Sequence, residues 1–179
     1  MKTDTIKLRR RAFLMLLPIT LAGCGFQLRR LDGVPFASMH LDAPADSAVS
    51  LRIRKALESS GHVRLVGMAD QAEAVLKLGQ ENRSKTILSL SGAGRVTEYR
   101  LGYRLTYSVA GKEGRVWIDQ DKIELTRDFT YSDSALLAKA AEEQLLYRNM
   151  EDDAAQQILR RLRSLKLSQP ETERSLKLP

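Results

Sequence analysis

Residues 95–109 constrain the fold of this chain more than any other segment, because apolar side chains occupy every second position there. Successive side chains of a strand point to opposite faces. The period of two therefore predicts a long strand in a sheet with one covered apolar face and one uncovered polar face. The apolar set is Tyr99, Leu101, Tyr103, Leu105, Tyr107 and Val109, and the polar set is Glu98, Arg100, Arg104, Thr106 and Ser108.

Shorter patterns before this strand predict a helix and three brief strands. A helix capped by Asp46 or Ser47 is expected to end at Gly61, because apolar residues recur at helical spacing between them. The strands are expected at 38–42, 63–66 and 74–80.

The patterns after it predict a hairpin and a second helical region. Residues 111–114 read as the hairpin loop, and the return strand is expected to place Trp117, Ile123, Leu125 and Phe129 on one side. From Ser134 the pattern becomes helical, with a late apolar stripe and an expected break near Asn149. The stripe consists of Ala155, Ile158, Leu162 and Leu165.

The order of these elements predicts the fold class, which is α/β of the α+β type. We expect a two-layer sandwich in which two main helices pack on one face of a mixed, roughly four-stranded sheet. The domain is expected to span residues 36–167. Residues 168–179 are polar, contain two prolines and lack an apolar stripe, so this tail is expected to be disordered.

The amino-terminal segment has the organisation of a bacterial lipoprotein signal. A basic stretch precedes a short apolar run, which ends in Leu21-Ala22-Gly23-Cys24 and is too short to span a bilayer. This tetrapeptide resembles a lipobox, so residues 1–23 are expected to be removed and Cys24 to carry a diacylglycerol and an N-acyl chain. Residues 24–35 would form the lipidated tether. Gly25 after the cysteine favours the outer membrane, with the domain facing the periplasm.

The same segment is compatible with a second export route. The stretch Arg10-Arg11-Ala12-Phe13-Leu14 also resembles part of a twin-arginine signal, although a basic segment readily produces such pairs.

Charge and side-chain chemistry argue against nucleic-acid binding and catalysis. The chain has a net charge of +7, but residues 1–23 contain five basic residues and one acidic residue, which leaves 24 basic and 21 acidic residues, or +3. No basic recognition helix with interleaved aromatics is evident. The two histidines, His40 and His62, lack neighbouring metal ligands, and no nucleophile motif is present. We therefore expect no enzyme activity, no metal and no cofactor other than the lipid on Cys24.

Three short motifs resemble the LptE family of lipopolysaccharide-assembly lipoproteins. They are Cys24-Gly25-Phe26-Gln27-Leu28-Arg29, Thr97-Glu98-Tyr99 at the start of the long strand, and the stretch 154–162 in the last helix. The resemblance covers residues 24 to about 167. It implies two helices packed on a four-stranded sheet, a plug inside the lumen of the LptD β-barrel, help in assembling that barrel, and a part in delivering lipopolysaccharide to the cell surface. The alternative is an accessory lipoprotein of another envelope export complex.

Lipopolysaccharide is anionic, so a protein that meets it needs positive side chains in suitable positions. Arg95 is expected near the tip of a hairpin, beyond the small residues 92–94, and Lys139 lies in a stretch that resembles the start of the family's second helix. We predict that these two residues contact lipopolysaccharide phosphates or the barrel wall. The second group of candidates is Arg83, Lys85, Arg100 and Arg104.

Overall fold

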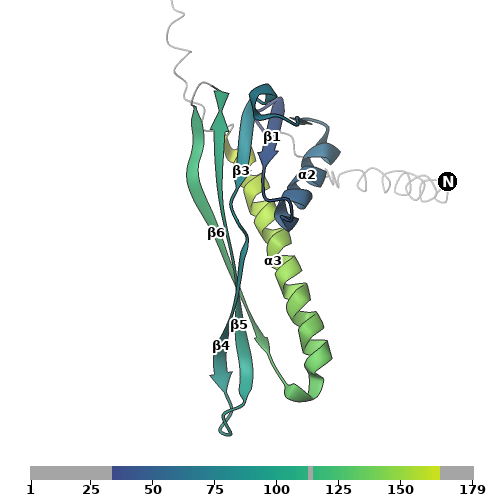
Figure 1. Cartoon of the computed structure of the whole chain (residues 1–179), viewed down its shortest axis with the longest axis vertical. Coiled ribbons are helices and arrows are strands. Elements are labelled where there is room, and N and C mark those ends of the chain that lie inside the picture. Colours follow the sequence, from purple (N-terminus) through teal and green to yellow (C-terminus); the bar gives the residue numbers. More distant parts are fainter. Residues whose placement is uncertain (1–33, 113–114, 166–179) are drawn as a thin grey trace, which may run out of the picture. The chain divides into compact units, whose positions relative to one another are not determined.

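The computed structural model describes residues 34–112 and 115–165 (Figure 1). Within these residues six strands form one sheet, and two α-helices cover one of its faces. This arrangement confirms the predicted two-layer α+β class, with six strands in place of about four. Cys24, the signal segment and the predicted tail at 168–179 lie outside the described residues.

The elements follow one another along the chain with short connections. The helices are α2 (Ala48–Ser60) and α3 (Leu136–Ser164), and the 3-10 turns are η2 (Ala69–Gln71) and η4 (Asp133–Ala135). The strands are β1 (Ser38–Asp42), β2 (Arg64–Leu65), β3 (Ala74–Leu78), β4 (Asn82–Leu90), β5 (Val96–Gly111) and β6 (Val116–Thr130).

Strand β5 is the centre of the sheet. It is long enough for β3 and β4 to pair with successive stretches of it, while β6 pairs along nearly its whole length. All three pairings are antiparallel, whereas β1 is parallel to both β2 and β3. The sheet is therefore mixed, as predicted.

The alternation along β5 has the predicted consequence. Leu101, Tyr103 and Leu105 are buried beneath the helices, while Arg100 and Arg104 are exposed on the other face. Tyr107 and Val109 continue the buried row. Because burying apolar area is the main favourable term in folding, this row fixes which face of β5 meets the helices.

The predicted limits of α2 are confirmed by its capping contacts. The Ser50 backbone N–H donates to Ser47 Oγ at 3.0 Å, which satisfies one of the free donors at the start of the helix. At the other end Gly61 has φ 67°, a left-handed conformation that favours glycine and commonly ends helices.

The predicted break in the last helix is wrong, because α3 runs without interruption through Asn149. Asn149 is exposed, so its side chain disturbs no packing, while Tyr147 and Met150 on either side are buried. The intrinsic penalty of one Asn in a helix is only a few tenths of a kcal/mol. Tertiary packing of the neighbours outweighs it.

Strand β6 also departs from the strict alternation of side chains that the sequence predicts for it. Tyr107 pairs with Asp121, but Val109 pairs with Ile118, so β6 contains a bulge between these positions. Ile118 is consequently buried. Trp117, which simple alternation placed on the same side as Ile123, is half-buried and packs edge-to-face on Phe36 at 5.1 Å between ring centroids.

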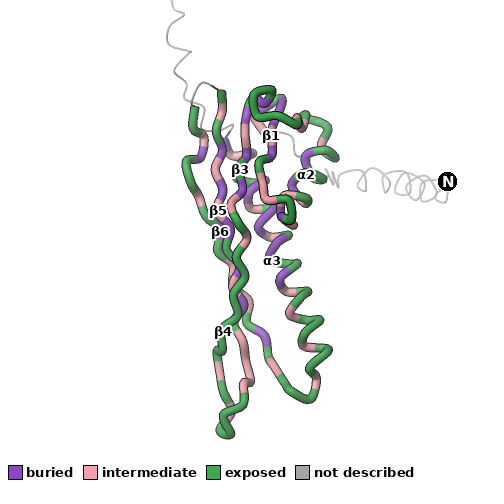
Figure 2. Tube along the Cα trace, viewed as in Figure 1, coloured by how far each residue is buried: buried purple, intermediate pink, exposed green. Residues whose placement is uncertain are grey.

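Burial divides the described chain into two parts, as Figure 2 shows. The packed half consists of β1, β3, α2, residues 147–164 of α3 and Leu165, together with the part of β5 that they cover. The distal half consists of β4, residues 96–100 of β5 and residues 136–146 of α3. In the distal half β4 is almost wholly exposed, and so are most of residues 136–146.

Candidate functional site

The six predicted cations lie in three different places and do not form one cluster. Residues paired across a sheet share a face, and Arg83 pairs with Tyr103 while Lys85 pairs with Leu101, so both cations face the helices. Arg100 and Arg104 lie on the uncovered face. Arg95 is in the loop between β4 and β5, and Lys139 is in the first turn of α3.

Arg95 closes the loop at the tip of the β4–β5 hairpin. The Ser91 backbone N–H donates to the Arg95 carbonyl at 2.7 Å, and the Gly94 N–H donates to the Ser91 carbonyl at 2.9 Å. Gly94 has φ 73°, which a residue with a side chain rarely adopts. The Arg95 side chain is exposed and has no hydrogen bond or ion pair in the described part of the chain. Its guanidinium is thus available to an external anion.

Lys139 is held by groups of the protein itself. Its Nζ donates to Glu142 Oε2 at 2.8 Å and to Thr130 Oγ1 at 3.1 Å, and only 19% of its side chain is exposed. An external phosphate would have to compete with the Glu142 carboxylate for this ammonium group.

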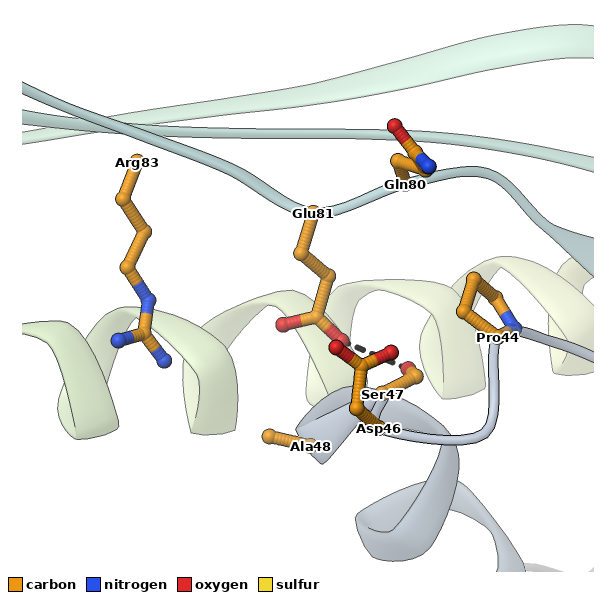
Figure 3. Close-up of a pocket in the computed structure, with 7 residues that line it drawn as sticks. All are labelled: Pro44, Asp46, Ser47, Ala48, Gln80, Glu81 and Arg83. Atoms are coloured by element: carbon orange, nitrogen blue, oxygen red, sulfur yellow. Dashed lines mark hydrogen bonds between the residues drawn. The ribbon is translucent and has the colours of Figure 1, made fainter.

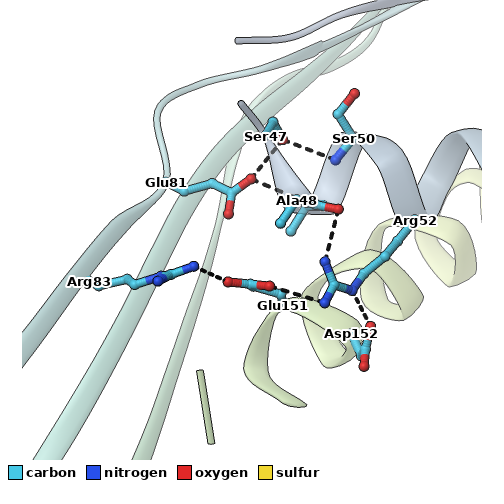
Figure 4. A network of polar contacts seen from close by, with 9 residues as sticks. Ser47, Ala48, Ser50, Arg52, Glu81, Arg83, Glu151 and Asp152 are labelled. Atoms are coloured by element: carbon cyan, nitrogen blue, oxygen red, sulfur yellow. Dashed lines mark hydrogen bonds and ion pairs between the residues drawn. The ribbon is translucent and has the colours of Figure 1, made fainter. Parts of the chain in front are cut away.

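Arg83 belongs to a network that joins the sheet to both helices (Figure 4). Its guanidinium donates to Glu151 Oε1, and Glu151 Oε2 pairs with Arg52 of α2 at 3.1 Å. Arg52 also donates to Asp152 and to the Ala48 carbonyl. The side chain of Glu151 is only 2% exposed. Its buried negative charge is therefore stabilised by these two guanidinium groups, and not by water.

Lys85 is enclosed by aromatic rings and a carboxylate. Its Nζ lies 4.2 Å from the centroid of Tyr99, and it donates to Glu143 Oε2 at 2.6 Å. The rings of Phe129 and Tyr131 lie 5.6 and 5.7 Å away. Cation–π contacts and an ion pair together hold this ammonium between the sheet and α3.

The uncovered face of the sheet carries paired charges. Arg100 donates from Nε and from a terminal nitrogen to the two oxygens of Asp128, at 2.7 and 2.8 Å, and Arg104 pairs with Glu124 at 2.9 Å. The hydrogen bond from Arg100 lowers the pKa of Asp128 below its usual range, and the same bond raises the pKa of Arg100. Each of these cations therefore already has a carboxylate partner.

A polar hollow of about 440 Å³ lies beside Arg83 at the start of α2 (Figure 3). Glu81 projects into it and accepts from the Ser47 hydroxyl at 2.6 Å and from the Val49 backbone N–H at 3.2 Å. Asp46 adds a second carboxylate. Glu81 serves as a cap for α2, and the two negative groups make the hollow a poor place for a lipid phosphate.

Sequence reasoning missed Glu151, the central residue of the network that links Arg83 of β4 to Arg52 of α2. A signal for it was present, since Glu151 lies four residues before Ala155 and so continues the apolar stripe of α3. A charged residue on a buried stripe indicates a buried partner. The two residues that follow Glu151, Asp152 and Asp153, pair with Arg52 and Arg127.

The described residues offer neither a metal site nor a membrane-spanning helix. No group of His, Cys, Asp and Glu side chains among residues 34–112 and 115–165 could hold a metal ion. None of the helices in this part of the chain is long and apolar enough to cross a bilayer.

Comparison with known proteins identifies the family. Residues 30–162 match the family described as "LptE: Lipopolysaccharide-assembly". The chain belongs to the LptE family. Two relatives named LPS-assembly lipoprotein LptE, from Photorhabdus laumondii and Pectobacterium atrosepticum, are 26% and 27% identical to it. The alignments cover 87% and 90% of both chains. The family resemblance seen in the sequence is thereby confirmed.

Solved structures show the same fold. The solution structure of lipoprotein B from Nitrosomonas europaea is 34% identical, with a TM-score of 0.68 over 80% of this chain and 94% of that one. The crystal structure of rare lipoprotein B from Shewanella oneidensis is 28% identical, with a TM-score of 0.64 over 73% and 96%. The family and these neighbours show an envelope lipoprotein that functions in lipopolysaccharide assembly.

Proposed function

We propose that this protein is an outer-membrane lipoprotein that plugs the lumen of an LptD-type β-barrel, assists the assembly of that barrel and takes part in lipopolysaccharide transport to the cell surface. Membership of the LptE family supports the broad role. The attachment group in this proposal is the diacylglycerol and N-acyl chain on Cys24, with the domain facing the periplasm. Two or three acyl chains suffice for a durable anchor, whereas one is marginal.

The observation that carries the plug proposal is the uncovered face of the sheet. Its central stretch on β5 presents Arg100, Arg104 and Thr106, and the facing positions on β6 are Asp128, Glu124 and Lys122. The lumen of a membrane β-barrel is polar and hydrated. A sheet face that is polar and internally charge-paired can lie against such a wall without leaving an unpaired charge buried.

The proposed role needs no catalysis. Family membership describes lipopolysaccharide assembly, and the mechanism consists of filling a lumen and contacting an anionic lipid. The proposed function therefore includes no enzyme activity.

Arg95 is the best-placed of the six cations for direct contact with lipopolysaccharide. It lies at the exposed hairpin tip, and its guanidinium is free in the described part of the chain. Guanidinium groups bind phosphate through paired hydrogen bonds. We place Lys139 second because Glu142 and Thr130 already engage it. The remaining candidates, Arg83, Lys85, Arg100 and Arg104, stay predictions whose contact with phosphate would require exchanging an internal carboxylate.

The partner is tested by isolating the protein from its own membrane. The carboxyl terminus is tagged, outer membranes are solubilised in mild detergent, and the proteins that copurify are identified. We expect one large β-barrel in roughly equal amount, and we expect that barrel to protect the domain from added protease. Copurification with an inner-membrane export complex, or with no partner, would reject the plug proposal; the first result would favour the accessory-subunit alternative.

The lipid contact is tested by binding of purified lipopolysaccharide to the mature chain. Arg95→Gln is expected to weaken binding about tenfold, the loss typical of one charge-assisted hydrogen-bonded contact. Arg127→Gln is the matched control, since it removes the same charge at a position that Asp153 already neutralises and that is not among the six candidates. Equal losses in the two variants would show that net charge, and not the hairpin tip, determines binding.

A further inference from the structure

The cations of the described chain differ in whether a carboxylate accompanies them. Arg83, Lys85, Arg100, Arg104 and Arg127, in the middle of the sheet, are paired, whereas Arg95 at the hairpin tip is not. A second set has no ion pair in the described part of the chain. Its members near one end of the sheet are Arg64, Lys112, Arg115, Arg161 and Arg163, which we call the basic end.

The strand register places these residues at the same end. Ser38 pairs with Arg64, and Met39, next to Ser38, pairs with Ala74. Ala74 in turn pairs with Gly111, the residue before Lys112. On the other edge of β5, Ala110 pairs with Val116, the residue after Arg115. One row across the sheet therefore joins Arg64 to Lys112 and Arg115.

The last turns of α3 reach the same part of the molecule (Figure 1). Arg161 lines an open groove together with Tyr107, four residues before the end of β5, and Ile123, in the middle of β6. The carboxylate of the groove, Asp121, is already engaged, because it accepts from the Tyr107 hydroxyl at 2.9 Å and from the Lys122 backbone N–H at 2.8 Å. No ion pair joins it to Arg161 in the described part of the chain.

Aromatic and apolar side chains accompany the charges at this end. The Arg115 guanidinium lies 5.2 Å from the ring centroid of Trp117, the single tryptophan of the chain. Val116 and Met68 are 59% and 55% exposed. Tryptophan, basic residues and exposed aliphatic groups together are typical of protein surfaces at the membrane–water interface.

The position of this end in the chain brings it near the proposed anchor. Val34 is the first described residue, and Phe36, two residues later, packs on Trp117. Cys24 precedes Val34 by ten residues. A chain of that length spans at most about 36 Å when fully extended. A lipid on Cys24 would hold Val34, two residues before Phe36, within this distance of the bilayer.

We propose that the basic end lies against anionic phospholipid headgroups of the leaflet that holds the anchor. The phosphates contact the guanidinium and ammonium groups that lack an ion pair, and the exposed part of the half-buried Trp117 ring, beside Arg115, lies at the level of the headgroups. The proposal rests on the lipid anchor of the proposed function, but not on the barrel or on lipopolysaccharide contact. Two carboxylates, Asp70 and Glu73, lie near this end, and Glu73 accepts from the Ala37 N–H at 2.7 Å. These carboxylates reduce the net positive charge of the basic end. We therefore expect it to bind a surface with net negative charge, and not a zwitterionic surface whose phosphates are balanced by cationic headgroups.

The test uses the mature chain with Cys24→Ser, so that no acyl chain holds it to the membrane. Vesicles are made of phosphatidylcholine alone or of phosphatidylcholine with phosphatidylglycerol. Binding is measured by sedimentation and by protection of Trp117 fluorescence from acrylamide. We expect binding to the anionic vesicles and protection of Trp117 there, with neither result on phosphatidylcholine alone.

A triple variant and a matched control locate the surface. Arg64→Gln, Arg115→Gln and Arg161→Gln together are expected to reduce binding on the order of 100-fold, because each cation near an anionic bilayer contributes about a factor of five. The control removes three cations that also lack ion pairs in the described chain but lie elsewhere on the helices, through Arg54→Gln, Lys55→Gln and Arg148→Gln. It should retain wild-type binding.

The results separate this inference from the proposed function, because the vesicles contain neither a barrel nor lipopolysaccharide. No binding to anionic vesicles would overturn the inference and direct attention to a protein partner for this end. An equal loss in the control variant would also overturn it, since net charge would then explain binding. A chain that binds these vesicles but copurifies with no barrel would leave the inference intact and reject the plug.

Discussion

The packed half and the distal half of the domain use different interactions to hold α3 on the sheet. In the packed half, Met150, Ile158 and Leu162 of α3 are fully buried against β5 and α2. In the distal half the connections are largely polar: Lys85 pairs with Glu143, and the Tyr147 hydroxyl, at the boundary between the halves, donates to the Ser84 carbonyl at 2.8 Å. Buried area contributes most of the free energy of folding, so the packed half stabilises the domain while the distal half can differ in sequence at low cost.

The same comparison bears on function. The hairpin tip with Arg95 lies in the distal half, and the basic end lies in the packed half near the proposed anchor. A surface that must adapt to a partner is best carried by a region with little apolar packing. We infer that the packed half holds the domain together and that the distal half provides the adaptable surface.

The largest difference is expected from truncating apolar residues on α3 in the two halves. Ile158→Ala should lower the free energy of unfolding by about 2–5 kcal/mol, because it removes a fully buried side chain and leaves a cavity. Leu145→Ala, in the distal half, should change it by less than about 0.5 kcal/mol, since Leu145 is 50% exposed. Urea unfolding followed by circular dichroism measures both. Similar losses would mean that the two halves are packed alike.

A smaller effect is expected where the halves meet, at Glu151. Glu151→Ala should destabilise the domain by about 2 kcal/mol, less than the 3–5 typical of a fully buried pair, because Arg52 and Arg83 stay partly exposed to water. Asp153→Ala is the control. It removes a carboxylate that pairs with Arg127, but both side chains are about 40% exposed, so a loss below about 1 kcal/mol is expected. Equal losses, again from urea unfolding, would contradict a special role for burial at Glu151.

Features decided by neighbouring residues could be predicted from the sequence. The alternation along β5 and the caps of α2 at Ser47 and Gly61 are local patterns, and the structure confirms them. The continuity of α3 through Asn149 could not be predicted in the same way, because it depends on contacts of Tyr147 and Met150 with other elements. The bulge in β6 depends likewise on its register with β5.

The candidate site shows the same limit. The sequence marks cations, but it does not show which carboxylates they meet. Arg83 and Glu151 are 68 positions apart in the chain, and their pairing follows from the packing of α3 over the sheet. Arg95 could be placed at a hairpin tip because the glycines of the loop are adjacent to it in the sequence. The roles of all six cations stay predictions.

The smallest expected effect concerns pH and the uncovered face of the sheet. The hydrogen bond from Arg100 lowers the pKa of Asp128 in the folded protein. A carboxyl group with a lowered folded-state pKa adds stability at pH values above its unfolded pKa, about 3.9, and this contribution disappears as pH falls through the folded value. The stability difference between wild type and Asp128→Asn should therefore be present at neutral pH and vanish in acid. Salt should reduce it, because the pair is exposed. Melting temperatures of both proteins at neutral and acidic pH measure this difference; if it grew in acid, the Arg100–Asp128 contact would not stabilise the uncovered face.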